Sequence, residues 1–267
     1  MAERLTTFLT ANKLIDPELQ KAFLPGINGV IEHNHVMDEI VKDAKHKNRT
    51  CHIAFFDLED AFGSVPHSLI DLTLERNFIP PVIRKYFHTL YTHSSAVVQT
   101  SKWRSNQFPF KRGVFQGDPI SPVIFLLVFN PILQKLQMNS HKGYKLGEVS
   151  HVTTPYADDF CLITRDKRTQ QNLIGDSEIS SIRDEEQKFL GKLLFFKGKP
   201  QETFNLVKDT FVKGIERIGA AMVRDEFKLW MYTNYLLPSK RFLLTIHTLT
   251  DTQLKSLDTL TDKAIKS

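Results

Sequence analysis

The sequence predicts a mixed α+β fold. Apolar residues recur at helical spacing in several segments, for example at Val36, Ile40 and Val41 within a helix expected over 31–46. Short apolar runs predict strands instead, and the clearest of them is 52–58. With 41% hydrophobic residues the chain can bury a core, and it has no run of about 18 apolar residues, so a membrane-spanning helix is not expected.

The remaining elements follow without an internal repeat or a long Gly/Ser linker. Helical spacing or helix-entry prolines predict helices at 1–24 (broken at Asp16-Pro17), 67–77, 81–91, 121–137 and 166–174. Pro131 is expected to kink or break the fourth of these. Paired strands are expected at 97–100 and 108–110. Residues 201–267 predict helices, the first with Phe204, Val207, Phe211, Ile215 and Ile218 on one face.

The charge balance suits a nucleic-acid partner. The chain has 35 Lys and Arg residues against 30 Asp and Glu, a net charge of +5. Basic residues cluster in three places, each of which is equally consistent with a phosphate-binding surface or an ordinary solvated face: 42–49, 102–112 and 192–199. Cys51 and Cys161 lie in apolar runs, which predicts core thiols in an intracellular protein without disulfides.

Three carboxylates predict a metal site. The run Tyr156-Ala157-Asp158-Asp159 places two of them at a turn, and Asp57 ends an apolar strand 101 residues upstream of Asp158. Adjacent carboxylates repel each other, and Mg²⁺ prefers oxygen ligands. The pattern therefore predicts a site for two divalent cations, as in many phosphoryl transfers. An Asp-Asp pair is also common in ordinary turns, and an Asp after a strand can simply cap a helix.

Three sequence blocks resemble the palm motifs of reverse transcriptases. They are FDLEDAF at 56–62, RGVFQGDPISP at 112–122 and YADD at 156–159, in the order and approximate spacing of that family. The sequences DAFGSVPH at 60–67 and QGDPISP at 116–122 are similar to those of non-LTR (LINE-type) retrotransposons. Weaker similarity extends toward both ends, so the resemblance covers nearly the whole chain.

The resemblance implies a polymerase right-hand fold with an antiparallel palm sheet backed by helices. Residues 1–50 would be partial fingers, 51–200 the palm and 201–267 a helical, thumb-like region. The implied activity is RNA-directed DNA polymerisation, in which deoxynucleoside triphosphates are joined to a DNA primer on an RNA template. Two Mg²⁺ ions are the implied cofactors, with Mn²⁺ as a substitute. No membrane is implied, protein partners are not indicated, and an active element is expected in the nucleus.

The resemblance also assigns residues to roles. Asp57, Asp158 and Asp159 would be the catalytic carboxylates and metal ligands, and Leu58 would add its backbone carbonyl as a ligand. The nucleotide would meet the backbone of Leu58, the backbone N–H groups of Asp60 and Ala61, and the ring of Phe62 against its sugar. Gln116 and Gly117 would line a pocket near the nascent base pair. The alternative prediction for Phe62 is that it packs in the core.

Contacts with the template and primer are implied in two places. Arg112 would contact phosphate, and Gly113 would let the backbone approach the nucleic acid closely. Phe189-Leu190-Gly191 resembles the primer-grip hairpin that precedes the thumb.

The chain departs from the family in two places. Asp57 lies close to the start of the chain, so the fingers are expected to be incomplete. Only 29 residues (160–188) separate Asp159 from Phe189, where relatives carry a strand, a full helix and a further strand. The helix at 166–174 spans about 13 Å, which is short for palm strands of about 17–20 Å. An internal deletion or a gene-model error after residue 174 explains this, and no lysine matches the general acid for pyrophosphate.

Three functional hypotheses follow. The first is an RNA-directed DNA polymerase domain that is impaired by these departures. The second is a non-catalytic retroelement remnant that at most binds nucleic acid. The carboxylates favour the first and the shortened palm favours the second. A group II intron-type maturase would share the palm, but it is expected to carry a basic splicing domain beyond the thumb.

Overall fold

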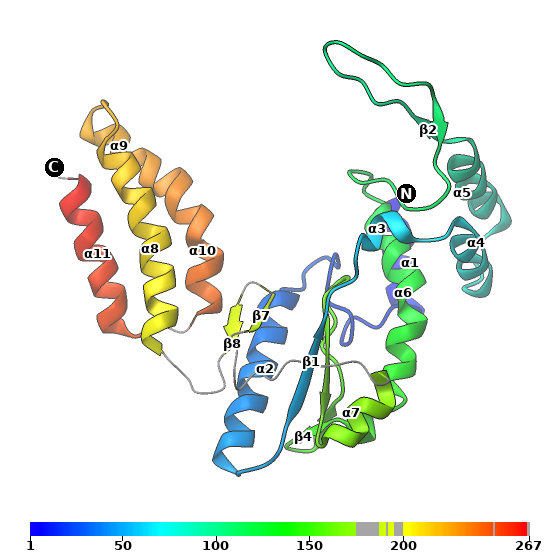
Figure 1. Cartoon of the computed structure of the whole chain (residues 1–267), viewed down its shortest axis with the longest axis horizontal. Coiled ribbons are helices and arrows are strands. Elements are labelled where there is room, and N and C mark those ends of the chain that lie inside the picture. The colour runs from blue at the N-terminus through cyan, green and yellow to red at the C-terminus, as the bar shows by residue number, and fades with distance from the viewer. Residues whose placement is uncertain (175–186, 191, 195–199, 248, 266–267) are drawn as a thin grey trace. The chain divides into compact units, whose positions relative to one another are not determined.

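The computed structural model describes residues 1–174, 187–190, 192–194, 200–247 and 249–265 (Figure 1). Contacts divide the chain into two compact units, Met1–His33 with Glu39–Ser177, and Asn34–Asp38 with Glu178–Ser267. Each unit combines helices with short antiparallel strands, which confirms the predicted α+β class. Within the described ranges, no helix has both the length and the apolarity needed to cross a membrane.

The first unit is built around one large apolar core. Its helices are α1 (Ala2–Ala11), α3 (Ala61–Ser64), α4 (His67–Arg76), α5 (Pro81–His93), α6 (Ser121–Gln137) and α7 (Lys167–Ile174), while α2 (Gly29–His46) contributes to both units. α6 supplies the centre of the core, and α1 and α4 pack against it. α6 continues through Pro131, so the predicted break is absent; the proline lies on the exposed side of the helix, where only one backbone hydrogen bond is lost.

A strand pair in the first unit positions the acidic residues. β1 (His52–Phe56) pairs antiparallel with β6 (Phe160–Thr164), and the pairing ends at Phe56 opposite Phe160. One face of the pair buries Ala54 and Leu162 against side chains of α6 and α7. The chain before β6 joins it only through isolated bridges, so the predicted strand–turn–strand is present with a weak first strand. A separate hairpin joins β4 (Tyr144–Leu146) to β5 (Val149–His151).

A hairpin arm follows α5. β2 (Ser95–Ala96) pairs with β3 (Phe108–Pro109), and beyond them Gln99 bridges to Arg104. We call residues 95–109 the β2–β3 arm. Figure 1 shows it as a long loop that extends away from the end of α5. The predicted strand at 108–110 is confirmed at Phe108–Pro109, but its partner is Ser95–Ala96 and not the predicted 97–100, where only Gln99 forms a bridge.

The second unit is a small hairpin followed by helices. β7 (Gln187–Phe189) pairs with β8 (Lys192–Leu194), and the helices are α8 (Pro200–Gly219), α9 (Asp225–Met231), the π-helical η2 (Tyr232–Leu236), α10 (Leu237–Ile246) and α11 (Asp251–Ile265). The five apolar residues predicted on one face of α8 are all buried, and they form a core with Leu236 and Leu257. The helical periodicity of this segment is confirmed.

Candidate active site

The β1–β6 register brings Asp57 and Asp159 to the same end of the strand pair. Asp57 follows the last residue of β1, and Asp159 precedes the first residue of β6. Because Phe56 pairs with Phe160, the register continued by one residue sets Asp57 opposite Asp159. Asp158 lies in the adjoining turn. Asp57 and Asp158 both lie near enough to Asp159 for their charges to act on it.

The turn that carries two of these carboxylates is a tight hairpin. The N–H of Tyr156 donates to the Asp159 carbonyl at 2.7 Å, and the N–H of Asp159 donates to the Tyr156 carbonyl at 3.1 Å. Between them, Ala157 has a φ of 56°, a left-handed conformation that costs a non-glycine residue about 1–2 kcal/mol. Such strain persists only where the surroundings fix the backbone.

Gln20 fixes the backbone of the strained residue. Its Oε1 accepts the N–H groups of Ala22 and Ala157, both at 3.0 Å, and its Nε2 donates to the Ala157 carbonyl at 3.4 Å. The Gln20 side chain is only 1% exposed, so water does not compete for these bonds. Sequence patterns do not predict that Gln20 contacts the turn, because the contact joins residues 137 positions apart.

His33 holds the chain that enters the turn. Its Nε2 lies 2.8 Å from the Pro155 carbonyl, and since a carbonyl only accepts, this nitrogen carries the proton. Burial is the main cause that lowers the pKa of His33 to about 4. His33 is therefore neutral at pH 7 and acts as an uncharged donor. Like Gln20, it lies outside the three palm motifs.

Aromatic rings anchor the same end of the strand pair. Phe56 and Phe160 stack with 4.8 Å between ring centroids, and Phe129 of α6 lies 5.7 Å from Phe160. Such pairs contribute about 0.5–1.5 kcal/mol each beyond the burial of their area. These rings tie both chain segments that carry the carboxylates to α6.

The carboxylates interact as like charges. Burial, followed by the charges of Asp158 and Asp57, raises the pKa of Asp159 above its usual range. None of the ion pairs formed between described residues involves any of the three. The end of the strand pair is therefore an acidic site without a counter-charge from the described part of the chain.

The donor set suits a divalent cation in type and in charge. Carboxylate oxygens are the ligands that Mg²⁺ prefers, and a cation would relieve the repulsion that acts on Asp159. The described residues contain no group of three or more His, Cys, Asp or Glu side chains already arranged to hold a metal ion. Coordination by Asp57, Leu58, Asp158 and Asp159 stays a prediction.

The residues expected to hold the nucleotide follow β1 in a short helical turn. Asp60 has a φ of 47°, Ala61 begins α3, and Leu58 is half-buried against the core. Phe62 stacks on Phe125 of α6 with 4.8 Å between ring centroids, so it does pack against the core. Its contact with a sugar stays a prediction, as do the nucleotide contacts of the other three residues.

A close backbone contact joins this turn to the second motif. The N–H of Gly113 donates to the Val65 carbonyl at 2.7 Å, and the N–H of Val114 donates to the Phe62 carbonyl at 2.8 Å. Gly113 has a φ of 94°, and a Cβ there would lie 2.8 Å from the Gly63 carbonyl oxygen. Gly113 is thus required for packing within the chain. Its approach to nucleic acid stays a prediction.

The other predicted contacts of the second motif are exposed to solvent. Arg112 bridges to Pro66 through its backbone, and its side chain is exposed. Gln116 and Gly117 are exposed too, and Gly117 has a φ of 90° with no atom within 4 Å of an added Cβ. These residues are accessible to a ligand, and their roles stay predictions.

The expected primer-grip residues lie at the β7–β8 turn of the second unit. The predicted hairpin is confirmed by the pairing of β7 with β8. Phe189 is 4% exposed and Leu190 has a φ of 46°, while Gly191 lies outside the described residues. Phe189 is therefore a packing residue, and the contact of this turn with a primer stays a prediction.

Some of the clustered basic residues are engaged within the chain. Lys192 is buried and forms an ion pair with Asp38. The cluster at 192–199 was predicted to be a phosphate-binding surface or a solvated face, and both predictions are wrong for Lys192. Lys47 pairs with Asp43 on α2. The basic residues of the 102–112 cluster are exposed and take part in no ion pair between described residues: Lys102, Arg104, Lys111 and Arg112.

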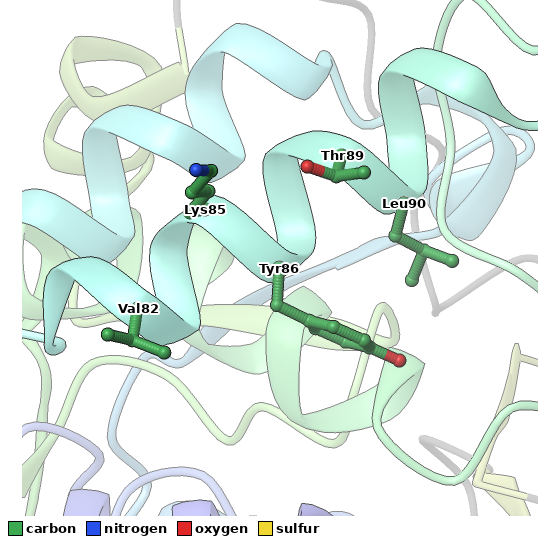
Figure 2. Close-up of a pocket in the computed structure, with 5 residues that line it drawn as sticks. All are labelled: Val82, Lys85, Tyr86, Thr89 and Leu90. Atoms are coloured by element: carbon green, nitrogen blue, oxygen red, sulfur yellow. The ribbon is translucent and has the colours of Figure 1, made fainter.

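A surface hollow lies on α5, and Figure 2 shows the side chains around it. The lining residues are Val82, Lys85, Tyr86, Thr89 and Leu90. Val82 and Tyr86 are 82% and 48% exposed. No predicted site residue lines this hollow, so it is separate from the acidic site.

The chain belongs to the reverse transcriptase family. The family model described as "Reverse transcriptase (RNA-dependent DNA polymerase)" matches residues 3–186, a range that includes all three motifs. The resemblance inferred from these motifs is therefore confirmed.

Polyproteins of R2 elements are similar to this chain, which identifies the domain as the non-LTR type. It is 28% identical over 228 residues to the Pol polyprotein of the type-2 retrotransposable element R2DM of Drosophila melanogaster, covering 84% of this chain and 21% of that protein. It is 31% identical over 152 residues to the R2 Pol polyprotein of Nasonia vitripennis, covering 57% of this chain and 14% of that protein. The matches thus span about a fifth or less of these relatives' length.

Solved telomerase structures share the fold. Apo telomerase from Candida tropicalis matches 99% of this chain and 54% of its own with a TM-score of 0.51 at 11% identity. Telomerase from Candida albicans, in complex with a TWJ fragment of telomeric RNA, matches 99% of this chain and 51% of its own with the same TM-score and identity. The predicted polymerase right-hand fold is confirmed.

Proposed function

We propose that this chain is the polymerase domain of an R2-type retroelement, and that it extends a DNA primer with deoxynucleotides on an RNA template. The observation that carries the proposal is the meeting of Asp57, Asp158 and Asp159 at one end of the β1–β6 pair. Membership of the reverse transcriptase family supports the reaction class.

The three carboxylates and the Leu58 carbonyl would hold two Mg²⁺ ions, or Mn²⁺ in their place. Such ions, when bound, neutralise negative charge on the phosphoryl group and on its attacking and leaving oxygens. The chain itself keeps the carboxylates in position. Gln20 and His33 restrain the turn, and the stacked rings of Phe56 and Phe160 restrain the strand ends.

Residues around the acidic site would orient the substrates. Backbone N–H groups at Asp60 and Ala61 would hold the triphosphate, and Phe62 would lie against the sugar. Gln116 and Gly117 would face the nascent base pair, while Arg112 would contact a phosphate. In this proposal residues 1–50 act as partial fingers, 51–200 as the palm and 201–267 as the thumb.

We also infer that extension by this chain is weak. α7 has eight residues and therefore spans about 12 Å, less than a typical strand of about 17–20 Å. Poor positioning of reacting groups can lower a rate about 100-fold. The same short helix favours the second candidate function, that of a remnant without catalytic activity which at most binds nucleic acid.

A primer-extension assay tests the proposal. The purified chain is supplied with Mg²⁺, deoxynucleotides and a DNA primer annealed to an RNA template, with Asp158→Asn as the matched control. The proposal predicts slow extension that needs Mg²⁺ and is lost in the variant. No extension by either protein would support the remnant. Fast extension by the wild-type chain would contradict the inferred impairment.

A further inference from the structure

We propose that the β2–β3 arm binds single-stranded nucleic acid, with Trp103 stacking on a base and the basic residues in and beside the arm contacting phosphates. The proposal deepens the proposed function and rests on it for the class of substrate. It assigns a binding role to the arm itself, residues 95–109, which the polymerase motifs leave without one.

The arm holds its tip in a defined conformation. The N–H of Thr100 donates to the Trp103 carbonyl at 2.8 Å, and the N–H of Ser105 donates to the Val98 carbonyl at 2.8 Å. The Ser105 hydroxyl oxygen also accepts the N–H of Val98 at 2.9 Å. A preformed tip loses little conformational freedom when it binds a ligand, which favours affinity.

The arm exposes large apolar side chains. Trp103 is 57% exposed, Val98 49% and Phe108 43%. Trp103 forms no ring-to-ring contact with another aromatic side chain of the described residues. The indole of Trp103 therefore offers a free face for stacking.

The charge around the arm selects a polyanion. Between Arg76 and Gly117 the sequence has seven Lys and Arg residues and no Asp or Glu. The rest of the chain has 28 basic and 30 acidic residues, so its net positive charge resides in this stretch. Lys102 and Arg104 flank Trp103, and Lys111 and Arg112 follow the arm. A surface that binds a neutral protein partner has no need to lack Asp and Glu, so the absence of these residues favours a negatively charged ligand.

Single strands fit the combination better than duplexes do. A duplex hides the faces of its bases, whereas unpaired bases can stack on an exposed aromatic ring. Stacking of this kind tolerates any base sequence, and adjacent cations add salt-dependent phosphate contacts. The arm is therefore expected to bind RNA and DNA single strands without sequence preference.

Tryptophan fluorescence tests the proposal, because the chain has only two tryptophans, Trp103 and Trp230. In Trp230→Phe the remaining fluorescence comes from Trp103, and in the matched control Trp103→Phe it comes from Trp230. Short oligo(U) and oligo(dT) should quench the Trp103 signal and leave the Trp230 signal unchanged. A blunt duplex should quench Trp103 much less. Quenching by duplex alone, or in the control alone, would overturn the proposal.

Affinity measurements separate stacking from charge. Trp103→Ala should weaken binding of oligo(U) roughly 5- to 150-fold, while Trp103→Phe should retain most of it. Lys102→Ala with Arg104→Ala should reduce the slope of log affinity against log salt by about 1.4, that is, about 0.7 for each contact. Unchanged affinity for oligo(U) in a folded Trp103→Ala protein would overturn the proposal. A variant that changes its oligomeric state but binds oligo(U) normally would also overturn it, because the arm would then be a protein–protein contact.

The two proposals fail in different ways. If the Trp103 signal is quenched but Asp158→Asn extends primers as well as the wild type, the arm stands and the polymerase proposal fails. If extension depends on Asp158 but the arm variants bind oligo(U) normally, the polymerase proposal stands and the arm proposal fails.

Discussion

Replacing Gln20 with leucine is expected to release the turn that carries Asp158 and Asp159. Leucine has a similar volume, but it cannot accept the N–H groups of Ala22 and Ala157 or donate to the Ala157 carbonyl. A buried donor left without a partner costs about 1–3 kcal/mol. With two such donors at 3.0 Å, we expect the free energy of unfolding of the first unit to fall by about 3 kcal/mol.

Two measurements check this value. The melting temperature should fall by about 6–12 °C, since a unit of this size loses about 2–4 °C per kcal/mol. Hydrogen exchange of the Ala157 amide should accelerate about 100-fold, because about 1.4 kcal/mol corresponds to a factor of ten. The rate of primer extension should fall by more than the loss of folded protein explains, because the carboxylates lose their fixed position.

Gln134→Leu is the matched control, because this glutamine is exposed on α6. It should change the free energy of unfolding by less than about 0.5 kcal/mol. If Gln20→Leu behaved like this control and left the Ala157 amide equally protected, the role of Gln20 in holding the turn would be refuted.

Three further predictions follow from the same contacts. In the wild type, the pKa of His33 is about 4 in the folded chain and 6.5 in the unfolded chain. The contribution of His33 to the free energy of unfolding is therefore complete above pH 6.5, and about 3 kcal/mol of it is lost as the pH is lowered to 4. In urea unfolding measured over this pH range, His33→Gln should not show this loss. Gly113→Ala should lower the free energy of unfolding by about 3 kcal/mol or more, whereas Gly117→Ala, which meets no neighbouring atom, should cost about 1–2 kcal/mol; equal losses would contradict the tight contact with Gly63. Asp159→Asn should stabilise the chain at pH 7 and reduce its further stabilisation by Mg²⁺ in thermal melts, and a destabilised variant would contradict the repulsion described above.

Local patterns predicted much of the fold. The apolar face of α8 follows from its helical spacing, and the strand that ends at Asp57 follows from its apolar run. The turn at Asp158 and Asp159 follows from the motif. These features depend on residues close together in the sequence, where periodicity and turn chemistry act directly.

The restraints on the site could not be predicted in the same way. Gln20 and Ala157 are 137 positions apart, and His33 and Pro155 are 122 apart, so no local pattern connects them. The contact of Gly113 with Gly63 joins a loop to helix α3, and these two segments meet only in the folded chain. The sequence predicted Lys192 to be a surface cation, because its partner, Asp38, lies 154 positions away.

The central claim is that Asp57 and Asp158 share divalent cations, and a crystal structure of the chain with Mg²⁺ and a non-reactive deoxynucleotide tests it most directly. The account predicts an ion with oxygens of both carboxylates about 2.0–2.1 Å away. It also predicts a second ion about 4 Å from the first. A structure in which the Asp57 carboxyl lies more than about 8 Å from that of Asp158, with no shared ion, would contradict the account, because ligands of one Mg²⁺ cannot be that far apart.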